Sequence, residues 1–334
     1  MRVLCRLLFT FSLAAVAGAT LHAQQPAQKP PTIRVGVDRV NVGVIVTDAQ
    51  GRFVEGLSRS DFHIFDNGAE QSITDFTSVD EPADVLVLIE AGPAVYLLEG
   101  THLRAAIGLL QGLSPADRVA IVKYSDAPEG LLDFTPDKQL AASIFDSLRF
   151  NLGFASLNLS SSLLKVLGWL GAISGKKSIV LLSTGVDTSS LPDSQATLTQ
   201  LRIGDVRLFA VSLAGALRGP SKDKKKPPSS KSVPAQLDRQ FAEADSFLRQ
   251  LSGAAGGRAY FPVTAADFRA AYAELAQLIR HEYSLAFAPQ TPDGAVHTLS
   301  VTVNPPVASP ANSKLRVDHR QAYQAAAPAS NERP

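Results

Sequence analysis

Hydrophobic residues near both ends of the chain alternate with other residues, the period of a strand with one buried face. Val40, Val42, Val44 and Val46 follow this pattern, and Asn67-Gly68 is a strong hairpin signal between two further short strands. The period of two returns after His281, at Tyr283, Leu285, Phe287, Leu299, Val301, Val303, Leu315 and Val317. Residues 33–80 and 282–323 are therefore predicted to be antiparallel β segments.

The middle of the chain, residues 84–281, has a different pattern. Unbroken apolar runs at 85–89, 119–122, 179–182 and 208–213 are typical of strands buried on both faces in a parallel sheet. Apolar residues at helical spacing lie between and after them, at Leu163, Val166, Leu167 and Leu170 and at Phe268, Tyr272, Leu275 and Ile279. This alternation predicts a doubly wound, mostly parallel α/β fold of the Rossmann-like kind. Trp169 is expected in or at the edge of its core.

Neither terminal β segment has enough strands to bury a hydrophobic face by itself. We therefore expect the N- and C-terminal segments to form one small antiparallel β subdomain, although about 200 residues separate them.

The first 23 residues resemble a secretory leader. Arg2 and Arg6 precede an apolar run from Leu7 to Leu21, and Ala23 ends a plausible cleavage site. The run is shorter than the roughly 20 residues of a spanning helix. We predict a signal peptide at 1–23, a Pro/Gln-rich linker at 24–32, and a secreted or periplasmic location; an uncleaved anchor is the alternative. The only cysteine, Cys5, lies in the leader, so disulfides, thiol catalysis and cysteine zinc sites are excluded for the mature chain.

The net charge of the chain bears on the class of partner that it can bind. The chain has 32 Lys and Arg against 31 Asp and Glu, and removal of the leader leaves 30 against 31, a net charge of −1. Such a balance does not indicate a nucleic-acid binder. Residues 218–236 are rich in Lys, Pro and Ser and are expected to form a flexible basic loop, and residues 324–334 a disordered tail. The loop is either simply solvated or a contact for an anionic partner, through Lys222, Lys224, Lys225 and Lys226.

From about Val37 to Tyr323 the chain resembles secreted bacterial VWFA-related proteins, built around a von Willebrand factor A-type domain. The motifs that carry the resemblance are VNVGVIVTDAQGRFVEGLSRSDFHIFDNGAEQSI, SDAPEGLLDFTPD, LSTGVDTSS, SGAAGGRAYFP and EYSLAFAPQ. The resemblance implies a site at the carboxyl ends of the parallel strands that holds Mg²⁺ or Mn²⁺ through oxygen ligands, the metal-ion-dependent adhesion site.

The ligand positions of that site are degenerate in this chain. The resemblance implies that Glu90 stands at the first aspartate, Gly92 and Ala94 at the two serines, Ala155 at the threonine and Thr184 at the later aspartate. If the register slips by one, Ser156 takes the place of Ala155. With the site lost, Glu90 would have to reach solvent or accept N–H groups of the 91–94 turn.

Three functions remain open. The leading one is a secreted, non-enzymatic protein-protein interaction or adhesion module with no cofactor, whose binding rim is formed by Glu90, Pro93, Asp126, Ser156, Thr184 and Asp187. The second is a module that depends on Mg²⁺ or Mn²⁺ bound by Glu90, Asp126 and Asp187. The third is an envelope hydrolase, for which the chain offers no GxSxG or HExxH motif. His63, His102, His281, His297 and His319 are widely spaced and are expected to be solvated or hydrogen-bonded. The partner, an unidentified envelope or extracellular protein, is not specified by the sequence.

Overall fold

The computed structural model describes residues 39–78, 81–96, 98, 101–148, 156–218, 235–290, 292–304 and 315–327, and the chain from Val37 onward forms one compact unit. The predicted signal peptide, the linker, residues 219–234 of the basic loop and residues 328–334 of the tail lie outside the described residues. Within the described residues, no helix has the length and apolar character needed to cross a membrane.

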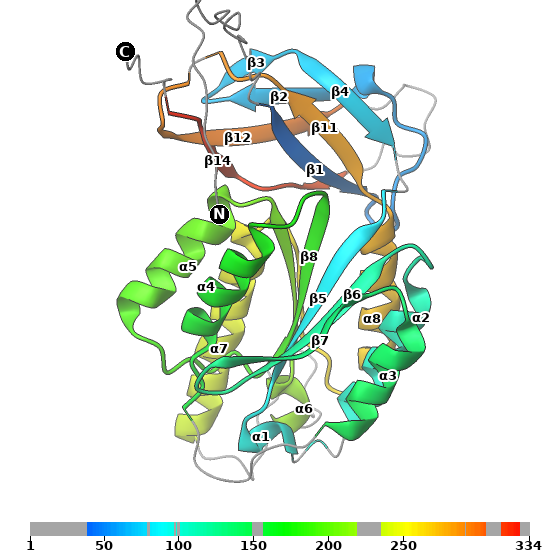
Figure 1. The fold of residues 1–334 in the computed structure, drawn as a ribbon, viewed down its shortest axis with the longest axis vertical. Helices are drawn as coiled ribbons and strands as arrows, with labels where there is room; N and C mark the ends of the chain where they lie inside the picture. The colour runs from blue at the N-terminus through cyan, green and yellow to red at the C-terminus, as the bar shows by residue number, and fades with distance from the viewer. Residues whose placement is uncertain are drawn as a thin grey trace, which may run out of the picture. The chain divides into compact units, whose positions relative to one another are not determined.

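A six-stranded sheet forms the centre of the α/β part (Figure 1), in the order β10-β9-β8-β5-β6-β7. All neighbours pair in parallel except β6 and β7, which are antiparallel. The strands are β5 (Ala83–Glu90), β6 (Arg118–Tyr124), β7 (Pro128–Thr135), β8 (Lys176–Ser183), β9 (Val206–Ser212) and β10 (Ala259–Tyr260). This mostly parallel sheet confirms the predicted fold class.

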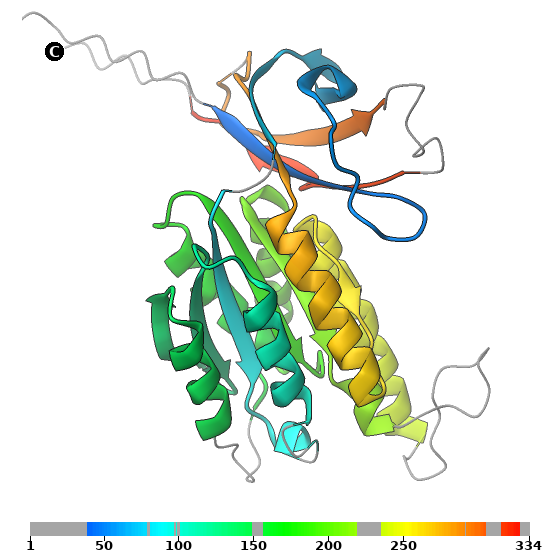
Figure 2. The same cartoon turned by 90° about the vertical axis from the view of Figure 1, so that its right-hand side faces the viewer.

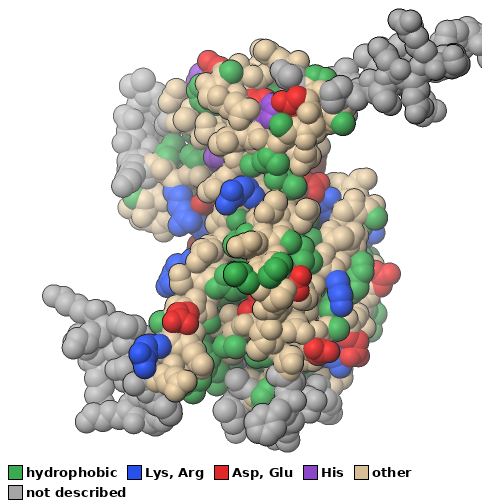
Figure 3. Space-filling model, turned by 90° about the vertical axis from the view of Figure 1, so that its left-hand side faces the viewer, with side chains coloured by type: hydrophobic (Ala, Val, Ile, Leu, Met, Phe, Trp, Pro, Cys, Tyr) green, Lys and Arg blue, Asp and Glu red, His purple; other side chains and the backbone are tan. Residues whose placement is uncertain are grey.

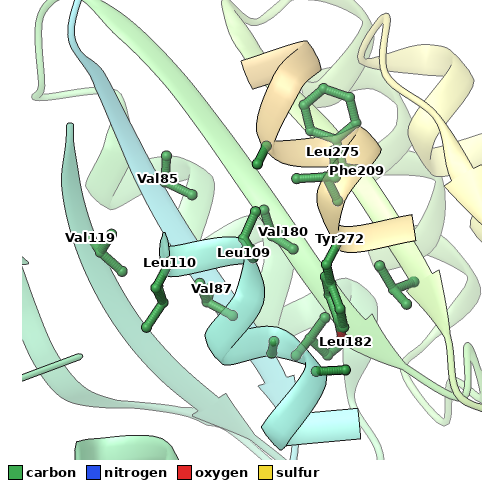
Figure 4. Packing of buried hydrophobic residues seen from close by; sticks show 14 of the residues in the cluster. Val85, Val87, Leu109, Leu110, Val119, Val180, Leu182, Phe209, Tyr272 and Leu275 are labelled. Carbon is green, nitrogen blue, oxygen red and sulfur yellow. The ribbon is translucent and has the colours of Figure 1, made fainter. Parts of the chain in front are cut away.

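Helices cover both faces of this sheet (Figure 2). One face packs on α2 (Thr101–Gly112), α3 (Lys138–Ser147) and α8 (Ala265–Arg280), and the other packs on α4 (Leu159–Leu170), α5 (Leu191–Ile203) and α7 (Ala235–Ala254). Successive residues of a strand point to opposite faces, so Val85 and Val87 join Leu109 and Tyr272 in one core (Figure 4), while Leu86 and Leu88 join the other. Burial on both faces explains the unbroken apolar runs.

Two four-stranded antiparallel sheets combine the two ends of the chain, with orders β13-β1-β11-β4 and β14-β12-β2-β3. Their strands are β1 (Val40–Thr47), β2 (Phe62–Asp66), β3 (Ala69–Gln71), β4 (Ile73–Ser78), β11 (Tyr283–Phe287), β12 (Val296–Val303), β13 (Arg316–Asp318) and β14 (Ala322–Gln324). Val42 lies opposite Leu285 and Ile64 opposite Val301, so alternating apolar residues from both ends share one core. The predicted pairing of the two segments is confirmed.

The β2–β3 hairpin turns at Asn67 and Gly68, which have φ of 48° and 84°. Positive φ at both central residues is what a type I′ turn requires, and Asn-Gly supplies it at low steric cost.

Ion pairs join the antiparallel sheets to the amino-terminal ends of β8, β9 and β10. The Nη2 atom of Arg207 in β9 donates to the Gly43 carbonyl of β1 and to Glu282, which comes directly before β11. Arg258, before β10, donates to Thr47 of β1 and to Asp318 of β13. The carboxyl ends of the parallel strands are therefore at the end of the sheet away from this junction, where the short helices α1 (Pro93–Tyr96) and α6 (Ala214–Arg218) lie.

Three expectations about this part of the chain are wrong. Trp169 is 48% exposed, because α4 buries Leu159, Leu163, Val166 and Leu170 and turns Trp169 off that stripe. Arg218, expected in the basic loop, ends α6 and is buried against Asp245, while Gln236 at the other end of that loop lies in α7. Gln324, expected in the tail, belongs to β14, and the N–H of Ala325 donates to the carbonyl of Ala295.

Candidate functional site

Three neighbouring strands end side by side at the carboxyl-terminal edge of the central sheet. Glu90, the last residue of β5, lies opposite Tyr124, the last residue of β6, and Ile89 lies opposite Leu182 of β8. Parallel pairing therefore places Ser183 and Thr184, the residues that follow Leu182, next to Glu90. The register of the sheet, and not nearness in sequence, assembles this group.

The carboxylate of Glu90 has no exposed surface and lies among hydrogen-bond donors. Its Oε2 atom accepts from the N–H of Thr184 at 2.7 Å, the Ser183 hydroxyl at 2.9 Å and the Tyr124 hydroxyl at 3.3 Å. The Thr184 hydroxyl donates toward both oxygens, at 3.0 Å and 2.8 Å. A buried carboxylate needs this kind of compensation for the water it has lost.

Burial raises the pKa of Glu90, although the N–H and hydroxyl of Thr184 and the hydroxyls of Ser183 and Tyr124 act in the opposite direction. The pKa of Tyr124 is also raised well above its ordinary value, by burial and by the charge of Glu90. The group thus favours an uncharged carboxyl more than an exposed glutamate does.

These contacts correct two expectations. Glu90 neither reaches solvent nor is held by its own 91–94 turn, since its donors come from the ends of β6 and β8. Glu90 and Thr184 were also expected on a binding rim, but they are 0% and 1% exposed and therefore offer no surface to a partner.

Leu157 lies over the loop that follows β5. A Cβ atom added to Gly92 would be 2.8 Å from Cδ2 of Leu157 and 3.3 Å from Oε1 of Glu90. A serine at this position, as in the family that the sequence resembles, would require the Leu157 side chain to move. An apolar side chain thus takes up space beside Glu90 where a metal site needs oxygen ligands.

Backbone and side-chain hydrogen bonds tie three loops of the rim together. The Asn158 amide donates to the carboxylate of Asp126 at 2.8 Å and accepts from the Thr188 hydroxyl at 3.0 Å. The Thr188 N–H donates to the Leu157 carbonyl at 2.8 Å, and the N–H of Asn158 donates to the Ser125 carbonyl at 2.8 Å. Asn158 and Thr188 thus hold the loops of the rim together, a role that was not predicted from the sequence.

Asp187 is held in the same region by hydroxyl and backbone donors. Its carboxylate accepts from the side chain and N–H of Ser160 at the start of α4, and from the N–H of Ser189 at 2.9 Å. Asp187 therefore fixes the start of α4 to the loop before α5.

The remaining predicted site residues have varied positions. Asp126 and Ser156 are exposed and Pro93 is half-buried, so these three present surface at the rim. Ala155, the side chain of Ala94, and Lys222, Lys224, Lys225 and Lys226 lie outside the described residues.

The three carboxylates of the metal-dependent alternative are held apart from one another. Glu90, Asp126 and Asp187 each accept from a separate set of donors. In the part of the chain that the structure describes, no three His, Cys, Asp or Glu side chains gather in an arrangement suited to a metal.

A second polar cluster, missed from the sequence, lies inside the antiparallel sheets. Asp66 of β2 accepts from Tyr323 of β14 at 2.8 Å and lies 2.8 Å from Nδ1 of His297 in β12, whose Nε2 faces Asp293 at 3.1 Å. His297 and Tyr323 are 6% and 2% exposed, so the cluster connects strands and has little contact with solvent. The sequence sign of this cluster was the position of His297, which alternates with exposed residues of β12 and shares the buried face of the strand with Leu299 and Val301.

No protein family model and no curated protein matches the chain. Among the solved structures that match, a von Willebrand factor type A protein from Catenulispora acidiphila is 10% identical, with 80% of this chain and 72% of that chain covered and a TM-score of 0.45. An aerotolerance-related membrane protein from Bacteroides fragilis is 11% identical, with 60% and 98% covered and a TM-score of 0.43. The von Willebrand factor domain of a type V pilus tip protein from Porphyromonas gingivalis is 15% identical, with 61% and 96% covered and a TM-score of 0.37.

These identities and TM-scores are too low to carry an argument about function. The fold assignment rests on the strand order itself, with five parallel strands, one antiparallel edge strand and helices on both faces. Residues 83–280 have a doubly wound, mostly parallel α/β fold of the Rossmann-like kind, joined to antiparallel sheets made from both ends of the chain.

Proposed function

We propose that this chain is an exported, non-enzymatic protein-protein interaction module that binds its partner without a metal ion. The contact surface is formed by the exposed Asp126, Ser156 and Thr188 and the half-buried Pro93, with the loops that carry them. The observation that carries the proposal is the buried carboxylate of Glu90, which accepts hydrogen bonds from donors on β6 and β8 and has no exposed surface.

The hydrogen-bonded frame of the rim supports a role in binding. Asn158 and Thr188 hold the loops at 125–127, 156–158 and 184–190 in one arrangement before any partner arrives. A surface that is already ordered loses less conformational entropy on association. Loops on a rigid sheet are also where binding residues are commonly found in α/β folds.

The export part of the proposal rests on the N-terminal sequence, with its basic start, apolar run and Ala23. Mass spectrometry of the protein from its native host tests it. A mature N-terminus near Gln24 is the expected result, and a pool that retains Met1 contradicts it.

Site-specific photo-crosslinking in the native host tests the binding surface. A photoreactive residue at Ser156 or Asp126 is expected to give a discrete crosslinked product that persists when a chelator is added. Lys165, exposed on α4 away from the rim, is the matched control position and should not give that product. Equal crosslinking at Lys165 would contradict the rim as the contact surface.

Loss of the product with chelator would instead support the metal-dependent alternative. The direct check is a thermal melt with millimolar Mg²⁺ or Mn²⁺, because a ligand that binds the native state raises the melting temperature. We expect no shift in the wild-type chain. A shift that Glu90→Gln abolishes would overturn metal independence.

A further inference from the structure

A charged cavity of about 500 Å³ lies where the antiparallel sheets meet the amino-terminal ends of β8 and β9, at the end of the central sheet opposite the rim. Pockets that hold small organic molecules have volumes of about 300–1,000 Å³. Lysine and arginine side chains lie on the surface at this level of the molecule, as Figure 3 shows in blue. The cavity takes no part in the function proposed above.

The buried wall of this cavity holds more positive than negative charge. Lys176 and Arg207 are 11% and 7% exposed and share one carboxylate, that of Glu282, at 3.4 Å and 2.5 Å. Burial acts to raise the pKa of Glu282, but the charges of Arg207 and Lys176 bring it below its ordinary value, so Glu282 is ionised. The single negative charge of Glu282 is therefore shared by the two cations Lys176 and Arg207.

Arg320 adds a third cation to the wall. Its guanidinium donates to the carbonyls of Ile203 at 3.3 Å and Asn41 at 2.7 Å, and no carboxylate among the described residues forms an ion pair with it. Burial lowers the pKa of Arg320, while the charge of Asp205 opposes this. The Nε atoms of Arg207 and Arg320 are buried and lack an acceptor in the described structure.

The other charged groups of the lining do not remove this excess. Lys177 pairs with Asp205 at 2.8 Å, and Arg39 pairs with Asp75. Glu81 also lines the cavity, and because its side chain is exposed, water weakens its charge without cancelling it. Lys176, Arg207 and the half-buried Arg320 thus face the nearly buried carboxylate of Glu282 and the exposed one of Glu81. The lining has an excess of one positive charge with Glu81 counted and of two without it, whereas buried charges in proteins are normally paired.

We propose that this cavity binds a small organic dianion, whose two negative charges lie beside Lys176, Arg207 and Arg320. The charge imbalance sets the charge of the ligand and the volume sets its size. Arginine and lysine both bind phosphate and carboxylate oxygens. A phosphate monoester and a dicarboxylate share this chemistry, and separate arms of the test distinguish them.

The test is calorimetric titration of the full chain with glycerol 3-phosphate, succinate and neutral glycerol at constant ionic strength. At least one dianion should bind with saturation and raise the melting temperature, while glycerol and added NaCl should not. The dianion that binds more tightly shows whether the ligand is a phosphate monoester or a dicarboxylate. If both dianions and NaCl change the heat signal and the melting temperature equally and without saturation, the proposal is overturned.

Variants localise the binding. Lys176→Gln and Arg320→Gln should each weaken the tighter dianion at least tenfold, and Lys165→Gln, which removes one exposed positive charge on α4, should change its affinity less than twofold. Glu81→Gln should tighten binding several-fold because it removes a like charge from the lining. If Arg320→Gln does not fold, Lys176→Gln and Glu81→Gln decide the outcome. Equal weakening by Lys165→Gln and Lys176→Gln, or weaker binding in Glu81→Gln, would overturn the proposal, while the crosslinks at the rim would be unaffected.

Discussion

Glu90 is the residue on which the proposal of metal-independent binding rests. Its pKa is raised, so folding favours the protonated carboxyl. A group whose pKa is higher in the folded state contributes its full stability below the pKa of the unfolded chain, about 4.3 for glutamate. That contribution is lost as the pH rises through the folded-state pKa.

Glu90→Gln should remove this pH dependence, because the amide has nearly the same shape and does not ionise. We expect the difference in melting temperature, variant minus wild type, to become more positive from pH 4 to pH 8. Thermal melts across that range measure it. A difference that stays constant with pH would contradict a raised pKa.

Glu90→Ala is the paired variant that removes the acceptor. It leaves the Thr184 N–H and the hydroxyls of Ser183 and Tyr124 without the carboxylate. Unsatisfied buried donors cost about 1–3 kcal/mol each, so the variant should be less stable than Glu90→Gln by about 2–4 kcal/mol at pH 7. Urea denaturation measures the loss.

The strands from the C-terminal segment are elements on which the N-terminal ones depend. Deletion of residues 290–334 removes β12, the partner of β2, and β13, the partner of β1. Unpaired strands expose backbone groups and an apolar face. Residues 39–78 should therefore become sensitive to limited proteolysis in the truncated chain, and unchanged resistance would contradict the observed pairing.

His297 in β12 contacts Asp66 in β2, and the stability that this contact adds should depend on pH. Burial acts to lower its pKa, but hydrogen bonds and charge from Asp293 and Asp66 outweigh this and raise the pKa. The stability it adds is full below the unfolded pKa of about 6.5 and is lost as the pH rises through the folded-state value. The stability lost in His297→Gln should thus be largest near pH 6 and smaller near pH 9, measured by urea denaturation at each pH. His63→Gln, which removes a half-buried histidine of the same sheet, is the control and should destabilise the protein less.

Elements with strong local patterns were predictable from the sequence, whereas the site was predictable only in part. The resemblance placed Glu90 and Thr184 at one site, but it predicted neither their burial nor the hydrogen bonds among Glu90, Thr184, Ser183 and Tyr124. The apolar run of β5 and the Asn67-Gly68 turn carry their structure in adjacent residues. Glu90 meets Thr184 only because β5 pairs with β8, and nothing local to either residue encodes that register. His297 and Asp66 are likewise 231 positions apart. The two adjacent hydroxyl residues at the end of a buried strand, Ser183 and Thr184, were a local sign of these hydrogen bonds.

At the scale of the whole molecule, buried arginines connect the α/β part to the antiparallel sheets. Arg258 and Arg316 both pair with Asp318, at 2.6 Å and 2.9 Å, but their side chains are 8% and 58% exposed. Removal of one partner of a buried ion pair leaves an uncompensated charge and costs about 3–5 kcal/mol, whereas exposed pairs contribute about 0–1 kcal/mol. The two arginines therefore form a matched pair for an experiment on one carboxylate.

Arg258→Gln should lower the free energy of unfolding by about 3 kcal/mol, because Asp318 and the Thr47 hydroxyl lose their buried donor while Arg316 still pairs with Asp318. Arg316→Gln should lower it by about 1 kcal/mol or less. Guanidinium denaturation followed by circular dichroism and by fluorescence of Trp169, the one tryptophan of the chain, measures both and reports whether the two signals change together. Coincident transitions in the wild type and a large loss confined to Arg258→Gln are expected, since the buried contact joins the two parts. Equal losses in the two variants would mean that burial of Arg258 does not govern the strength of this junction.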